Sequence, residues 1–272
     1  GIVAAVTGFL ADRESLIMEL SHFVDEDAQK SFIRVEFEDN AGTGAEVEAM
    51  SAAFKQKVAS RFGMRFDFHS STQKLRTLIA VSKQSHCINA LLHQWWDGHL
   101  PIEITGIVSN HDEQRSLAEW YDLPFHHFPI ETGKKPQQEA RILDLFDKTG
   151  SELLVLARYM QILTPHACET LAGRAINIHH SFLPAFIGAN PYRQAYERGV
   201  KLIGATCHYV TSKLDAGPII EQEVKPVQHF HKAKDLMRLG RDCERTALAR
   251  GIRHHVNDRT IIHKNRAIVF PD

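Results

Sequence analysis

Residues 75–108 read LRTLIAVSKQSHCINALLHQWWDGHLPIEITGIV, and this stretch decides the fold class. It begins with an apolar run at 75–81 that predicts a buried strand, and the apolar residues that follow from Ile88 to Trp95 have helical spacing. A second apolar run at 102–108 predicts another strand. A strand, a helix and a strand in this order form a βαβ unit, whose parallel strands are covered by helices on the faces of the sheet.

The same alternation continues through the rest of the chain. Further strands are predicted at 125–128, 153–156, 175–179, 202–210 and 218–224, and helices at 136–149, from Pro165 and at 232–254, with a closing hairpin at 260–269. Repeated β-α units of this kind indicate a doubly wound, mostly parallel sheet. We therefore expect one α/β domain over residues 75–272.

The first 68 residues follow a different pattern. A helix is predicted over the first ten residues, strands at 16–23 and 32–37, a helix at 44–62 and a strand at 64–68. This order lacks only a leading strand to become β-α-β-β-α-β, the ferredoxin-like α+β unit. The chain opens at Gly1 directly in the helical pattern, so we expect further residues upstream. The polar stretch at 69–74 is the predicted linker.

Composition limits the class of protein. Apolar residues make up 43% and charged residues 24% of the 272 residues, which is typical of a globular enzyme. The net charge of −1 gives no general attraction to nucleic acid or to an anionic membrane. No apolar run approaches the ~18 residues that a membrane span needs, and no secretory signal opens the chain. The four cysteines are widely separated, as expected of free thiols in the cytoplasm.

Three polar side chains are candidates for chemistry. The predicted strand 175–179 reads AINIH, so Asn177 and His179 share one face at its carboxyl end, the edge where such sheets bind ligands. The turn LDAGP at 214–218 adds the carboxylate of Asp215. An amide, an imidazole and a carboxylate can together promote acyl transfer. On residue type alone, a packing role for the asparagine and the histidine is the more frequent case.

The paired histidines do not predict a metal centre. His126 and His127, and His179 and His180, occur without a set of cysteines or carboxylates at ligand spacing. Adjacent residues on a strand also point to opposite faces of the sheet. We therefore expect no metal site.

Three strings together carry a resemblance to a known family. They are INIHHSFLPAFIGA at 176–189, GATCHYV at 204–210 and LDAGPII at 214–220, and with them the whole chain resembles the folate-dependent formyltransferases, in particular their deformylase branch. The resemblance implies that Asn177, His179 and Asp215 are the catalytic residues. The string RYMQIL at 158–163 is similar to the folate-pocket segment of the family, which implies folate contacts from Met160, Gln161, Ile162, Leu163 and, in the loop that closes the pocket, Gly217.

The reaction that this resemblance implies is hydrolysis of 10-formyltetrahydrofolate to tetrahydrofolate and formate. The formyl folate is then the substrate, water is the acceptor, and no separate cofactor is needed. Asn177 would stabilise the oxyanion, His179 would act as general acid and base, and Asp215 would position the water. Such an enzyme supplies formate and balances the one-carbon folate pools used in purine synthesis.

Two alternatives remain open. One is transfer of the formyl group to an amine such as glycinamide ribonucleotide, for which transferases of the family use a glycine-rich phosphate loop. The equivalent loop, VSKQSHC at 81–87, has no glycine, and a close backbone cradle for phosphate usually needs one. This favours water. The other alternative is a binding protein without activity on the same scaffold.

The first 68 residues resemble an ACT domain. This resemblance implies an amino-acid effector bound near the start of the first helix, at Gly1 to Val3, and assembly into a homo-oligomer. A domain that serves only dimerisation is the alternative interpretation of this block.

Overall fold

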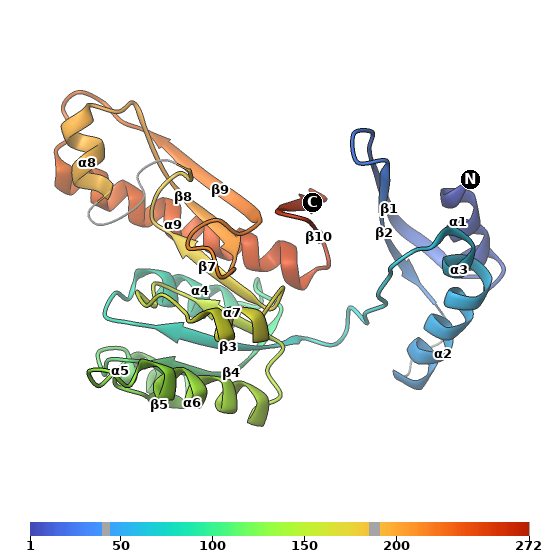
Figure 1. Cartoon of the computed structure of the whole chain (residues 1–272), viewed down its shortest axis with the longest axis horizontal. Helices are drawn as coiled ribbons and strands as arrows, with labels where there is room; N and C mark the ends of the chain where they lie inside the picture. Colours follow the sequence, from blue (N-terminus) through green and yellow to red (C-terminus); the bar gives the residue numbers. More distant parts are fainter. Residues whose placement is uncertain (40–43, 185–190, 272) are drawn as a thin grey trace. The chain divides into compact units, whose positions relative to one another are not determined.

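The computed structural model describes residues 1–39, 44–184 and 191–271, which form two compact units. Unit 1 comprises Gly1–Gln73 together with the C-terminal residues from Phe270, and unit 2 comprises Lys74–Val269. Figure 1 shows residues 1–73 of unit 1 in blue to cyan and unit 2 in colours from cyan to red.

Unit 1 packs helices on one side of a hairpin. Its elements are α1 (Ile2–Ala11), β1 (Leu16–Asp25), β2 (Lys30–Glu38), α2 (Gly44–Phe54), the π-helical turn η1 (Lys55–Ala59) and α3 (Ser60–Phe62). Strands β1 and β2 pair antiparallel in a two-stranded sheet. The buried core of this unit comes from the helices: Val6, Phe9, Leu10, Met50, Phe54, Val58 and Ala59.

The strand predicted at 64–68 is wrong. These residues form no ladder with another strand, although they follow an apolar alternation. The alternation is explained by packing, because the rings of Phe66 and Phe68 lie edge-on to Phe54, with centroid distances of 4.9 and 5.4 Å. Alternation of apolar and polar residues therefore indicates an extended segment with one buried face. It does not indicate that another strand is present to pair with that segment.

Unit 2 is built on a seven-stranded sheet with the order β5-β4-β3-β6-β7-β8-β9. The strands are β3 (Leu75–Val81), β4 (Ile102–Ser109), β5 (Phe125–His127), β6 (Leu153–Leu156), β7 (Ala175–His179), β8 (Leu202–Tyr209) and β9 (Ile219–Pro226). Strands β3 to β7 pair parallel, and β8 and β9 add antiparallel neighbours at one edge. The prediction of a mostly parallel, doubly wound sheet is confirmed.

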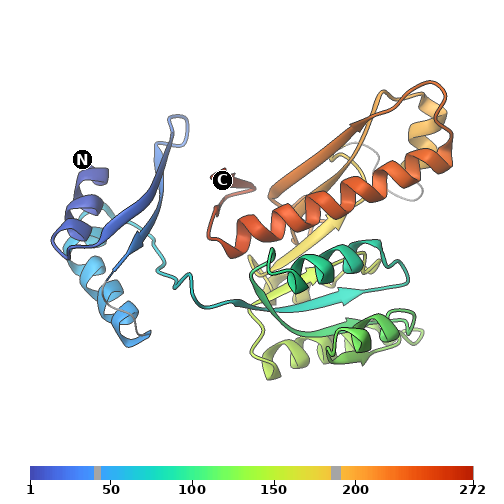
Figure 2. The same cartoon turned by 180° about the vertical axis from the view of Figure 1, so that it is seen from behind.

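Helices cover both faces of this sheet. Residues of α4 (His86–Trp96), α5 (Arg115–Trp120) and α9 (Ala233–Val256) belong to one buried cluster, and residues of α6 (Lys135–Lys148) belong to the other. Helix α7 (Pro165–Thr170) packs against α6. Figure 2 shows α9 running along β8 and β9, with which it makes many contacts. The hairpin β10 (Thr260–His263) and β11 (Arg266–Val269) follows α9.

Helix α8 (Pro191–Arg198) was not predicted from the sequence. Its sequence, PYRQAYER, is too polar to show a long apolar stripe, although Tyr192 and Ala195 are buried. Among all the helices in the described part of the chain, none is long and apolar enough to cross a membrane.

The strand order locates the functional edge. From β3 the chain moves outward through β4 to β5 and then returns to β6 on the other side of β3. Such a change of direction leaves a crevice at the carboxyl ends of the strands, where open α/β sheets bind ligands. The carboxyl ends of β3, β6 and β7, at Val81, Leu156 and His179, meet there.

Candidate active site

The imidazole of His179 and the carboxylate of Asp215 are in direct contact. His179 ends β7, Asp215 lies in the turn between β8 and β9, and His179 Nδ1 is 3.2 Å from Asp215 Oδ2. Both side chains are at least nine-tenths buried. Asp215 has φ = 51°, in the left-handed region that aspartate tolerates better than most side chains.

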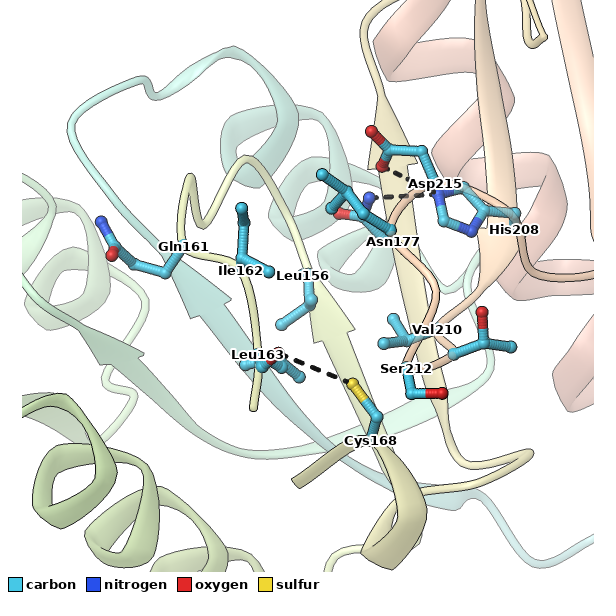
Figure 3. Close-up of a pocket in the computed structure, with 12 residues that line it drawn as sticks. Leu156, Gln161, Ile162, Leu163, Cys168, Asn177, His208, Val210, Ser212 and Asp215 are labelled. Atoms are coloured by element: carbon cyan, nitrogen blue, oxygen red, sulfur yellow. Dashed lines mark hydrogen bonds and ion pairs between the residues drawn. The ribbon is translucent and has the colours of Figure 1, made fainter. Parts of the chain in front are cut away.

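Asn177 joins these two residues through a fourth, His208. Residues 177 and 208 are opposite partners in the antiparallel pair β7–β8, and Asn177 Nδ2 lies 3.2 Å from His208 Nε2. His208 Nε2 is in turn 3.8 Å from Asp215 Oδ1. Figure 3 shows Asn177, His208 and Asp215 converging at one side of a pocket. The three predicted residues therefore lie together, around a histidine that was not predicted.

The sequence did contain a signal for His208. It lies within the string at 204–210, and its strand is otherwise composed mainly of apolar or small residues. A histidine that is 3% exposed in such a strand needs polar partners, and its partners are the catalytic candidates.

Hydrogen bonding fixes the protonation of His208. Its Nδ1 lies 2.9 Å from the carbonyl oxygen of Tyr209, so Nδ1 carries the proton that is donated. Burial lowers the pKa of His208, so the ring is neutral near pH 7 and its Nε2 is an acceptor. Asn177 Nδ2 donates to that acceptor, which leaves its second N–H available for another group.

The charge of Asp215 is also defined. Burial works to raise the pKa of this carboxyl group, but the hydrogen bond and charge of His179 lower it below its usual value. Asp215 is therefore ionised near neutral pH. His179 directs Nδ1 at this carboxylate, and its buried Nε2 has no hydrogen-bond partner among the described residues, so Nε2 is the ring nitrogen left for a further hydrogen bond.

A pocket opens beside these residues on the α6–α7 face of the sheet. One side comes from the end of β6 and the loop after it, and the other from β7, β8 and the turn before β9. The lining residues are Leu156, Gln161, Ile162, Leu163, Cys168, Asn177, His208, Val210, Thr211, Ser212, Leu214 and Asp215. Apolar walls with a few convergent polar groups are typical of a small-molecule site.

Helix α6 holds the loop that forms one wall. The amide N–H of Thr164 donates to the Glu139 carboxylate, with distances of 3.1 and 3.2 Å to its two oxygens. The Lys135 ammonium donates to the carbonyl oxygen of Ile162. These contacts anchor the loop at both Ile162 and Thr164.

The predicted folate residues divide into two groups. Gln161, Ile162 and Leu163 line the pocket. Met160, which is 56% exposed, and Gly217 are not among its lining residues. A Cβ at Gly217 would lie 1.8 Å from the carbonyl oxygen of Tyr209, so this glycine permits close packing of the turn that carries Asp215. Residues 185–189, the end of the first family string, lie outside the described residues.

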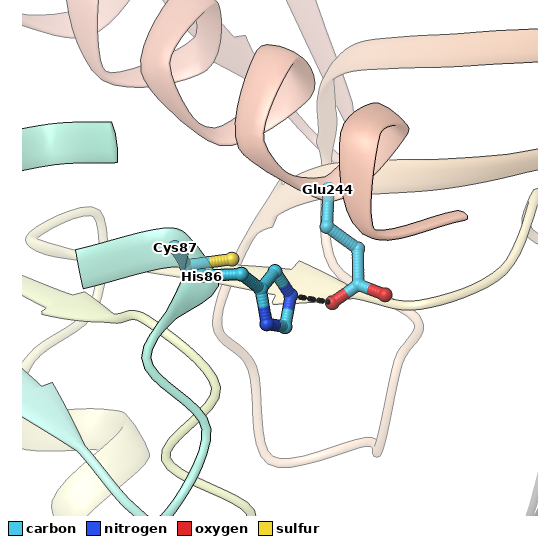
Figure 4. A group of neighbouring side chains, drawn as sticks. All are labelled: His86, Cys87 and Glu244. Carbon is cyan, nitrogen blue, oxygen red and sulfur yellow. Dashed lines mark hydrogen bonds and ion pairs between the residues drawn. The ribbon is translucent and has the colours of Figure 1, made fainter. Parts of the chain in front are cut away.

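One group of side chains has the composition of a metal site, namely His86, Cys87 and Glu244 (Figure 4). Its surroundings do not suit a cation. The Arg158 guanidinium already lies 3.3 Å from the Glu244 carboxylate, and burial raises the pKa of the Cys87 thiol, which opposes formation of a thiolate ligand.

Comparison with known proteins agrees with this geometry. Residues 75–252 match the family model described as formyl transferase. A formyltetrahydrofolate deformylase of Corynebacterium sp. (strain P-1) is 48% identical over 99% of this chain and 94% of its own length. The crystal structure of a formyltetrahydrofolate deformylase from Burkholderia mallei has a TM-score of 0.93 and 46% identity, covering 100% of this chain and 95% of the other. A glycinamide ribonucleotide transformylase from Symbiobacterium toebii has a TM-score of 0.70 and 27% identity, covering 77% of this chain and 99% of its own.

Proposed function

Since this chain belongs to the formyltetrahydrofolate deformylases, a branch of the formyl transferase family, we propose that Asn177, His179 and Asp215 are its catalytic residues. The reaction is hydrolysis of 10-formyltetrahydrofolate to tetrahydrofolate and formate. The observation that carries the assignment of residues is the convergence of these three side chains with His208. Asn177, Asp215 and His208 line one pocket, and His179 lies behind Asp215, in contact with its carboxylate.

Water is the nucleophile in this reaction. Its oxygen bonds to the formyl carbon, the carbonyl oxygen becomes an oxyanion, and the bond from carbon to N10 then breaks. N10 leaves with the electron pair and takes a proton, and the former formyl group leaves as formate. Each step needs either a donor to the oxyanion or a group that moves a proton.

Asn177 is the proposed stabiliser of the oxyanion. One N–H of its amide is held by His208, so the orientation of the amide is fixed before the substrate binds. The second N–H is the proposed donor to the oxyanion. One preorganised donor of this kind is worth about 3 kcal/mol of transition-state stabilisation.

His179 is the group proposed to move protons. Its Nδ1 faces the ionised Asp215, which fixes the ring, and Nε2 is the nitrogen proposed to accept from water and to donate to N10. Asp215 Oδ1 lies near His208 and Oδ2 near His179. The carboxylate thus lies between the histidine proposed to move protons and the histidine that holds the amide.

The folate is proposed to lie along Gln161, Ile162 and Leu163, with Met160 and Gly217 supporting the wall and the turn on either side. The loop presents backbone groups as well as apolar side chains, which suits the polar edge and the flat face of a pterin. The formyl folate is the substrate, and the proposal requires neither a cofactor nor a metal. The products, formate and tetrahydrofolate, balance the one-carbon pools for purine synthesis.

The N-terminal block, residues 1–68, is proposed to be an ACT domain that binds an amino-acid effector and supports a homo-oligomer. Its antiparallel hairpin and packed helices agree with the α+β class of such domains. We also propose a cytoplasmic location, to which the four free cysteines are suited. No partnership with nucleic acid or membrane is proposed, in keeping with the net charge of −1.

The test of the proposed function is formate release without an amine. Purified enzyme is incubated with 10-formyltetrahydrofolate in buffer, and formate and tetrahydrofolate are quantified. Equal amounts of both products, formed at a rate proportional to enzyme, are expected. Tetrahydrofolate that appears only after glycinamide ribonucleotide is added, with the formyl group on that amine and no formate, would contradict hydrolysis and favour the transferase alternative.

A further inference from the structure

A buried polar cluster lies beside the catalytic residues and is not used by the mechanism above. We call it the Glu244 cluster, and it consists of His86, Arg158, Tyr192 and Glu244. The four side chains come from the start of α4, the loop after β6, helix α8 and helix α9. Glu244 is 1% exposed, Arg158 6% and Tyr192 9%.

Every member of the cluster contacts the carboxylate of Glu244. His86 Nε2 lies 2.8 Å and Arg158 Nε 3.3 Å from its Oε2, and the Tyr192 hydroxyl donates to its Oε1 over 2.5 Å. Figure 4 shows His86, the first residue of α4, directed at Glu244 on α9. Burial works to raise the pKa of Glu244, but the His86 hydrogen bond and the Arg158 charge keep it below its usual value. The carboxylate is therefore ionised, and both of its oxygens are occupied.

Stability alone does not explain such a cluster. Buried ion pairs are often no better for stability than apolar side chains of the same volume, because burial of both charges is costly. Helices α4 and α9 are already joined by the apolar cluster that contains Leu91, Cys243 and Leu248. A set of large, mutually fixed polar side chains does, however, fill space rigidly.

The position of the cluster suggests which space it fills. His180 connects it to the active site, since its ring centroid lies 5.2 Å from that of His179 and 6.1 Å from that of Tyr192. The elements α4 and α9 lie on one face of the sheet, whereas the pocket opens on the α6–α7 face. The pocket and the Glu244 cluster thus approach the catalytic residues from opposite sides.

The chemistry gives these two sides different roles. The folate brings the formyl carbon in through the pocket, and its rings then occupy that side. A nucleophile has to approach the formyl carbon along a path that the folate does not block. The remaining path leads from the side of His180 and the Glu244 cluster.

We propose that the Glu244 cluster fills the acceptor side of the site and so restricts the nucleophile to molecules about as small as water. This inference rests on the proposed function, because it assumes that the formyl carbon is bound beside Asn177 and His179. A transferase with the same fold has to admit an amine many times larger than water on that side. In this chain the Arg158 and Tyr192 side chains occupy it.

The first test uses the unaltered enzyme and two nucleophiles of different size. Hydroxylamine and glycinamide are each added with 10-formyltetrahydrofolate, and formate and the N-formyl product are measured by mass spectrometry. Each enzymatic rate is divided by the uncatalysed rate with the same amine. We expect the corrected value for glycinamide to be at least about tenfold below that for hydroxylamine. Equal corrected values would overturn the proposal.

The second test changes volume at constant charge. The double variant Arg158→Ala with Glu244→Gln removes both charges and opens space, while Arg158→Met with Glu244→Gln removes the same charges and keeps most of the volume. In the Ala variant, the fraction of formyl groups that end on glycinamide should rise on the order of tenfold. In the Met variant, this fraction should be the same as in the unaltered enzyme. Formate release by the Ala variant with an unchanged share, or the same rise in both variants, would overturn the proposal.

The two tests also separate this inference from the proposed function. An unaltered enzyme that releases no formate in water contradicts the proposed function itself. An enzyme that hydrolyses the substrate and formylates both amines equally contradicts only the role of the cluster. If the Ala variant does not fold, the comparison of hydroxylamine with glycinamide on the unaltered enzyme still tests the proposed role of the cluster.

Discussion

Asn177 Nδ2 lies 3.2 Å from His208 Nε2, across the antiparallel pair β7–β8. His208 donates its only ring proton from Nδ1 to the carbonyl oxygen of Tyr209. Its Nε2 can therefore only accept, and the Asn177 amide is the donor in this contact. The amide oxygen and nitrogen of Asn177 therefore cannot exchange places without loss of the hydrogen bond. The orientation of the oxyanion donor is set by a residue that has no proposed chemical step of its own.

Replacement of His208 by Phe should mainly lower kcat. Phe keeps a ring but removes the acceptor, so the Asn177 amide loses its fixed orientation, and we expect kcat to fall about tenfold to a hundredfold with KM nearly unchanged. Steady-state formate release measures both constants. Gln, whose amide oxygen can accept the same hydrogen bond, should recover part of the loss. A purely structural role would lower stability and leave the kcat of the folded fraction unchanged.

Replacement of Asp215 by Asn should nearly abolish hydrolysis. Asn tolerates the left-handed conformation at φ = 51°, so the turn is retained while the negative charge beside His179 is lost. We expect formate release to fall by about a hundredfold or more, with folate binding preserved. Asp258→Asn is the matched control, since Asp258 is exposed and has φ = 52°. Unchanged turnover in Asp215→Asn would remove this carboxylate from the mechanism.

His180 should make the fold sensitive to mild acid. Burial, followed by the charge of Arg158, lowers the pKa of His180 from 6.5 to about 4. Between these two values the unfolded chain binds a proton that the folded chain does not, so stability is complete above pH 6.5 and falls as the pH is lowered toward 4.

The variant His180→Asn should therefore lose less stability on acidification. Urea unfolding at several values from about pH 7 to about pH 4.5 gives the slope of stability against pH. The exposed His166, replaced in the same way, is the control for loss of an imidazole at the surface. A slope that is the same in His180→Asn and in the unaltered chain would show that this ring does not stay neutral on acidification.

Replacement of Gly217 by Ala should disturb both stability and activity. The added methyl group would lie 1.8 Å from the carbonyl oxygen of Tyr209, so the turn or β8 has to move. We expect a loss of about 1–3 kcal/mol in the free energy of unfolding and a reduced kcat, because the same turn carries Asp215. Thermal unfolding and formate release measure the two effects. Gly8→Ala is the control, since a Cβ there meets no atom within 4 Å.

Local sequence patterns were sufficient for most of unit 2. Strands such as β3, β4, β6 and β7 are largely apolar runs bounded by polar segments, and their alternation with helices indicated a parallel sheet. The pattern failed where a segment lacks a partner, as at 64–68, and where a short helix is polar, as in α8. In both cases the deciding information is a contact with a distant element, and the period of the local sequence does not report it.

The candidate site was predicted only in part, for a related reason. The strings around Asn177, His179 and Asp215 resemble a family, and that resemblance, more than residue type, singled them out. His208 and the Glu244 cluster were missed. Glu244 and His86 are 158 positions apart, and no spacing rule connects residues at that separation. Their roles follow from the three-dimensional arrangement alone.

The register of β7 against β8 has a consequence for how this enzyme can vary. Ile176 and Ile178 bury on one face of the sheet together with Cys207 and Tyr209, so a slip of one residue would put apolar side chains in the pocket and polar ones in the core. Core packing therefore also protects the pairing of Asn177 with His208. Related enzymes can therefore diverge at these core positions by exchanges that keep them apolar and of similar volume, while the reacting groups keep their places.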